Sequence, residues 1–177
     1  MITAAARPPV PRPFRRIPPP YVLGARWLAS CNSRPEVTTT LWTRGDVAEV
    51  RVGVRFGIIR IHDRRLGNAA LGQLQGVVDI VGPVGPVILN DTQRCVEFFV
   101  ACTPTTTWDM RDSQLLDCGE RGERRVVIKC PPPGKRPSTG RRWLVEPDGG
   151  QALTQPASLA TALRHARRIL RVGGYAP

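Results

Sequence analysis

Apolar residues follow two different periods along this chain, and each change of period separates an expected helix from an expected strand. From Tyr21 to about Ser30 the spacing is helical. One face of this segment collects the apolar side chains of Val22, Leu23, Ala25, Trp27 and Leu28. The spacing predicts a first amphipathic helix.

A second, short helix is expected to follow almost at once. Asn32 or Ser33 supplies an N-cap, and Pro35 with Glu36 suits a first helical turn. The helix carries Val37, Leu41 and Trp42 and ends at Gly45. We expect the two helices to cover a sheet.

Strand character dominates the centre of the chain. Residues 50–61 are largely β-branched or aromatic, which predicts one strand that ends at His62 and Asp63. Helical spacing returns over residues 66–74, and residues 82–86 form a Gly/Pro turn. Residues 87–89 and 95–101 then predict a hairpin that turns at Asn90 and Asp91. The expected order is β, α, β, β.

The last third of the chain is more irregular. Residues 103–122 are polar, with a short helix predicted near residues 108–116. Strands are predicted over 124–130 and 142–145, joined by a Pro/Gly/basic loop at 131–140. Ser158 is expected to cap a closing helix with His165 on its solvated side. The predicted buried face of this helix consists of Leu159, Leu163, Ala166, Ile169 and Leu170.

The length of 177 residues fits one domain. Residues 1–20 contain no acidic residue and many prolines, so we expect a disordered, polyproline-like tail before a single domain over residues 21–175. The fold class is predicted to be α+β.

The sequence contains no apolar stretch of the roughly 18 to 20 residues that a membrane span needs, and prolines interrupt any export signal. We therefore expect a cytoplasmic protein without a membrane partner. Five cysteines form no C-x-x-C pair, and only His62 and His165 could join them, so they are expected to be reduced thiols.

The net charge is +12, which is typical of proteins that bind polyanions such as DNA or RNA. Lysine occurs only at Lys129 and Lys135, and the chain is rich in Ala, Gly, Pro and Val. GC-rich codons produce that composition without any selection for binding. Both interpretations of the charge stay open.

No complete catalytic set appears. His62 and Asp63 lie at a strand end. A metal site of the Asp-x-Asp type would also need a carboxylate two residues before Asp63, and Ile61 stands there. A turn hydrogen bond is the alternative role for this pair. The sequence has no strained Ser or Cys turn, no G-x-G-x-x-G and no P-loop.

A basic group surrounds the last two predicted strands. It comprises Arg121, Arg124, Arg125, Lys129, Lys135, Arg136, Arg141 and Arg142, with Trp143 beside them. If these strands pair, the cations and the indole form a groove for single-stranded nucleic acid. The alternative is a hairpin with solvated charges and a core Trp143.

Several segments together resemble the bifunctional DNA primase/polymerase N-terminal domain family. They are residues 25–30, 82–87, 98–100, 126–133 and 142–149. The resemblance covers residues 21–171 and implies an RRM-like β-α-β-β-α-β core and a connection to DNA replication.

Position by position, the resemblance implies few catalytic residues. Asp63 matches the second carboxylate of the metal motif, and Glu97 is a candidate third acid. Arg60 stands where the family has the Ser of its Ser-x-His motif. A degenerate domain that binds nucleic acid or a protein is therefore the leading hypothesis. The alternatives are an active nucleotidyltransferase with Mg or Mn, and a structural domain.

Overall fold

The computed structural model describes residues 18–101, 103–116, 126–135 and 140–172. Most of the expected tail, residues 1–17, therefore lies outside the described residues. Among the described helices, none has both the length and the apolar character needed to cross a bilayer.

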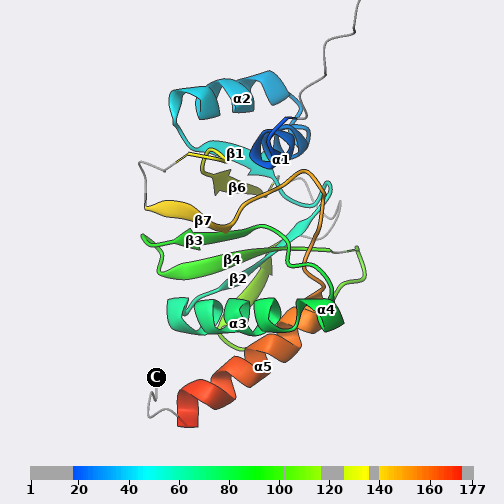
Figure 1. Cartoon of the computed structure of the whole chain (residues 1–177), viewed down its shortest axis with the longest axis vertical. Coiled ribbons are helices and arrows are strands. Elements are labelled where there is room, and N and C mark those ends of the chain that lie inside the picture. The colour runs from blue at the N-terminus through cyan, green and yellow to red at the C-terminus, as the bar shows by residue number, and fades with distance from the viewer. Residues whose placement is uncertain (1–17, 102, 117–125, 136–139, 173–177) are drawn as a thin grey trace, which may run out of the picture.

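A five-stranded antiparallel sheet forms the middle of the molecule (Figure 1). Its strands are β2 (Gly57–Ile61), β3 (Val87–Asn90), β4 (Cys95–Val100), β5 (Ser113–Leu116) and β7 (Arg141–Val145). Their spatial order is β5-β2-β4-β3-β7. The three inner strands consist mainly of buried β-branched, leucine and phenylalanine side chains on both faces, as expected for a sheet that is covered on both sides. The predicted α+β class is confirmed.

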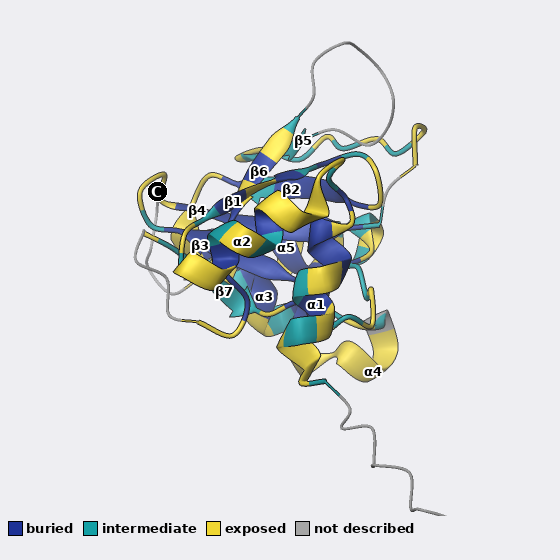
Figure 2. Cartoon of the chain, turned by 90° about the horizontal axis from the view of Figure 1, so that it is seen from above, coloured by how far each residue is buried: buried dark blue, intermediate teal, exposed yellow. Residues whose placement is uncertain are grey.

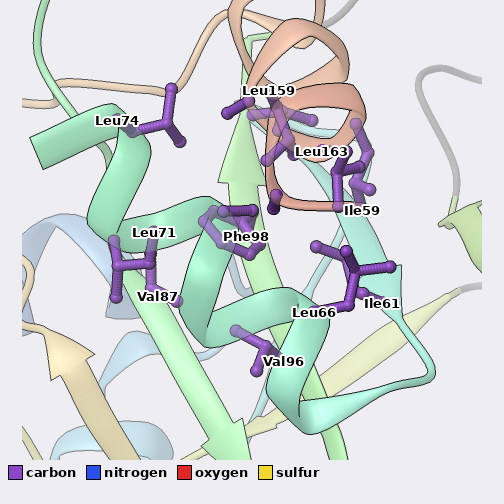
Figure 3. Close-up of a cluster of buried hydrophobic side chains, with 14 of the residues drawn as sticks. Ile59, Ile61, Leu66, Leu71, Leu74, Val87, Val96, Phe98, Leu159 and Leu163 are labelled. Carbon is purple, nitrogen blue, oxygen red and sulfur yellow. The ribbon is translucent and has the colours of Figure 1, made fainter. Parts of the chain in front are cut away.

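Helices α3 (Arg64–Gly76) and α5 (Pro156–Val172) cover one face of this sheet, and the short α4 (Val78–Val81) follows α3. Figure 3 shows Leu66, Leu71 and Leu74 of α3 and Leu159 and Leu163 of α5 directed at the sheet. The strands contribute Ile59, Ile61, Val87, Val96 and Phe98 to this cluster. Burial of these side chains stabilises the contact by about 1.5 to 3 kcal/mol each.

The opposite face is covered by a second layer. It contains α1 (Pro20–Ala29), α2 (Pro35–Arg44) and a two-stranded sheet of β1 (Ala48–Arg51) and β6 (Val127–Cys130). Figure 2 shows buried strands beneath α1 and α2, whose outer sides are exposed. Within this layer the ring of Phe56 lies between Trp27 at 5.8 Å and Phe99 at 4.6 Å. The prediction that the two first helices cover a sheet is confirmed.

The small sheet is held by side chains along its edges. Asn32 pairs with β1 as a strand would, because its Nδ2 donates to the Glu49 carbonyl at 2.6 Å and its Oδ1 accepts from the Arg51 N–H at 2.9 Å. On β6, the Lys129 carbonyl accepts from Arg141 Nε at 2.7 Å. These bonds satisfy backbone groups that an isolated pair of strands leaves open.

Several predictions differ from the structure. α5 begins at Pro156, so Ser158 is not its cap, and the N-cap of α2 is Arg34. Residues 50–61 form two strands in different sheets, because Gly53 adopts a left-handed φ of 87° and its N–H turns back to the Phe56 carbonyl. The helix predicted near residues 108–116 is wrong, since Ser113–Leu116 instead pairs with the open edge of β2. Ile169, predicted to be buried, is 47% exposed.

The expected order β, α, β, β is present as β2, α3, β3, β4. In the sheet, β4 lies between β2 and β3. Beyond β4 the described chain leads into strand β5 rather than a second helix. The second helix on that face is α5, at the end of the described chain.

Cys31, Cys95 and Cys130 are buried free thiols. Burial raises the pKa of Cys31 from 9.0 to about 11, partly offset by Arg55. Burial also raises the pKa of Cys130 and of Cys95. Cys102 and Cys118 lie outside the described residues.

These shifts predict an alkaline loss of stability. A pKa raised in the folded state stabilises the fold below the unfolded value, so this contribution is lost as pH rises from about 9 to 11. Urea unfolding across this range should give a falling free energy of unfolding. The fall should be smaller in Cys31→Ala, and an equal fall in both proteins would contradict the assignment to Cys31.

Candidate nucleic-acid interface

The strand end at His62 and Asp63 has a local structural role. Asp63 is the N-cap of α3, and its Oδ1 accepts from the Arg65 N–H at 2.7 Å and the Leu66 N–H at 3.1 Å. His62 is exposed, and its backbone N–H donates to the Asp112 carbonyl at 2.9 Å. The alternative of a turn hydrogen bond at this strand end is therefore confirmed for Asp63.

Glu97, the third acidic candidate, is completely buried within β4. Its Oε1 accepts from Arg60 Nε at 3.0 Å and lies 2.8 Å from Arg60 Nη2. Its other oxygen, Oε2, accepts from Arg141 Nη2. Both carboxylate oxygens are thus occupied by guanidinium groups. Within the described ranges, no three His, Cys, Asp or Glu residues come together as metal ligands.

The basic group around the last two strands is divided by the fold. β6 pairs with β1 and β7 pairs with β3, so the pairing that a groove between these two strands would need does not occur. Each strand finds a buried apolar partner elsewhere, which the charge pattern could not reveal. Arg121, Arg124, Arg125 and Arg136 lie outside the described residues.

Two members of that group have structural roles. Lys135 Nζ donates to the Trp42 and Thr43 carbonyls, at 3.2 and 2.9 Å, and so caps the end of α2. Trp143 is half-buried, with its ring 5.7 Å from Phe99 and its Nε1 donating to the Pro131 carbonyl at 3.0 Å. Trp143 thus packs against the core as a partly buried side chain, but the hairpin that the alternative assumed does not form.

Arginines gather instead at one end of the five-stranded sheet. Arg141 and Arg142 begin β7, Arg60 lies near the end of β2, Arg64 begins α3, and Arg94 lies in the turn between β3 and β4. We call these five arginines the basic edge. In Figure 1 the start of α3, the β3–β4 turn and the start of β7 lie together at the left of the molecule.

Ion pairs hold four members of the basic edge, Arg60, Arg64, Arg141 and Arg142. Asp91 accepts from Arg64 Nη1 at 2.9 Å and lies 3.6 Å from Arg142 Nη1. Glu97 joins Arg60 to Arg141, the neighbour of Arg142. Two carboxylates thus each serve two arginines. Within the basic edge itself, five arginines are joined by only two bridging carboxylates, those of Asp91 and Glu97.

Some arginine side chains of the basic edge are exposed to solvent and others are much less exposed. The side chains of Arg64 and Arg142 are 49% and 50% exposed, whereas that of Arg141 is 13% exposed. Arg64 and Arg142 therefore present guanidinium N–H groups to solvent while Asp91 holds them in place. Guanidinium groups fixed in this way match the oxygens of a phosphate.

Sequence reasoning named Arg141 and Arg142 but missed Arg64, Arg94 and Asp91, and it treated Arg60 only as a missing serine. A signal was present. Arg60 and Glu97 each interrupt a run of buried apolar residues, and opposite charges in two such runs predict facing strands.

No family model, no curated protein and no solved structure matches this chain. The likeness to the primase/polymerase family therefore stays a prediction.

Proposed function

We propose that this chain is a nucleic-acid-binding domain that contacts the phosphate backbone through its basic edge. The observation that carries the proposal is the pair of exposed arginines, Arg64 and Arg142, held by one carboxylate beside the buried Arg60–Glu97–Arg141 cluster. Contacts of this kind are independent of base sequence and are weakened by salt.

The arrangement of β2, α3, β3 and β4 supports one further part of the proposal. A helix that connects two parallel strands, with an antiparallel strand between them, is the first half of an RRM-like core. We include in the proposal an RRM-like core of primase/polymerase ancestry, used for binding. The carboxylates of Asp63 and Glu97 have the partners described above, which favours this use over nucleotidyl transfer.

The test is the fluorescence anisotropy of a labelled single-stranded oligonucleotide over a salt series. Replacing both Arg64 and Arg142 by glutamate should remove two phosphate contacts. Each contact to a single strand contributes about 0.7 to the slope of log affinity against log salt, so we expect the slope to become shallower by about 1.4, with weaker binding at low salt.

Arg55→Glu serves as the matched control, because Arg55 is an exposed arginine before the opposite end of β2. It changes the net charge without touching the basic edge. The control removes half as much charge as the double variant, so a loss half as large as that of the double variant would mean that only overall charge matters. Absence of binding by the wild-type protein at low salt would refute the proposal.

A further inference from the structure

A groove of about 590 Å³ that includes no residue of the basic edge lies between α2 and the outer side of the β1–β6 sheet. The turn before α2 forms one end of it, through Asn32, Ser33 and Arg34. Its volume lies within the range of about 300 to 1,000 Å³ that is usual for sites of small ligands.

The walls of the groove are apolar and exposed. Val37 of α2 is 50% exposed and Val127 of β6 is 42% exposed, and both line the groove together with Leu41 and Val47. The exposed valines stand on two walls of the groove. A flat ring placed between these walls would have apolar surface against each of its two faces.

Positive charge surrounds these walls. Arg34, Arg51 and Lys129 line the groove against a single carboxylate, Glu49. In the β1–β6 register Glu49 faces Lys129 and Arg51 faces Val127, so all four side chains share the outer face of the small sheet. The charges favour an anionic occupant, and the exposed valines favour one with an apolar part.

The frame of the groove is fixed before any ligand arrives. Asn32 bonds both to β1 and to Thr38, whose Oγ1 accepts from Asn32 Nδ2 at 2.7 Å. Thr38 is itself buried in α2. A preformed site loses less conformational entropy on binding.

Lys129 connects the groove with the basic edge. Its side chain lines the groove, and its carbonyl accepts from Arg141 Nε. An extended ligand that leaves the groove past β6 therefore comes next to the arginines of β7.

We infer that the groove receives one unstacked base of a single-stranded nucleic acid, with Arg34, Arg51 and Lys129 near its phosphates. The inference rests on the proposed function and adds a preference to it. A paired and stacked base cannot enter the groove, so the protein selects single strands over duplexes.

The test compares the affinities for a single-stranded oligonucleotide and for a duplex of the same length. Replacing both Val37 and Val127 by serine should weaken single-strand binding about tenfold and leave duplex binding within about twofold. The matched control replaces Val77 and Val78 by serine. These valines are 40% and 42% exposed and lie outside the groove. The control should change neither affinity.

Equal wild-type affinity for the two forms, or an unchanged ratio in the groove variant, would overturn the inference. Thymidine monophosphate, followed by amide chemical shifts, tests the groove without the basic edge. Shifts at Leu41 and Val47, which also line the groove, that are absent from the groove variant support the inference, and no shift at the groove overturns it. The Arg64/Arg142 variant tests only the proposed function, so the two failures are distinguishable.

Discussion

Glu97→Ala is expected to lower the free energy of unfolding by about 3 to 5 kcal/mol, because it leaves two guanidinium groups without their carboxylate inside the protein. The side chain of Glu97 is completely buried, and those of Arg60 and Arg141 are 25% and 13% exposed. Water cannot easily replace the lost partner. In a domain of this size the melting temperature should fall by roughly 10 °C.

Asp91→Ala is the matched control for this change. Asp91 also serves two arginines, but its side chain is 34% exposed, and those of Arg64 and Arg142 are about half exposed. Water and salt screen such pairs, so this variant should lose only about 0 to 1 kcal/mol. Urea unfolding of both variants measures the difference. Equal losses would show that burial of the Glu97 cluster is not what makes it stabilising.

The Glu97 cluster also shows how far the sequence could predict this molecule. Periodicity identified both N-terminal helices, α3, the β3–β4 hairpin and α5, because each buries an apolar face that repeats at its own spacing. Local patterns of this kind are visible in one segment at a time. The partners of each strand are not.

The local pattern of apolar residues could not predict which strands pair when they are distant in the sequence. β1 and β2 are adjacent in sequence but belong to different sheets, and β6 pairs with β1 rather than with β7. These choices depend on which buried faces complement one another in the whole fold. The groove that pairing of β6 with β7 would have formed is therefore not present, whereas a groove does lie between β6 and α2.

Gly24→Ala is expected to destabilise the fold by about 2 to 3 kcal/mol, although alanine is the better helix former. A Cβ atom at Gly24 would lie 1.8 Å from the carbonyl oxygen of Pro147. That obstacle is backbone, so it cannot be removed by a rotamer change. α1 would have to move away from the segment after β7 and disturb the buried Trp27 and Leu28.

Gly72→Ala provides the same substitution with the opposite expected sign. Gly72 lies in α3, and nothing lies within 4 Å of its added Cβ. The helical propensity of alanine should therefore stabilise the fold by about 0.5 to 1 kcal/mol. Urea midpoints of the two variants should move in opposite directions. A stabilised Gly24→Ala protein would mean that α1 does not pack on Pro147 as closely as the structure places it.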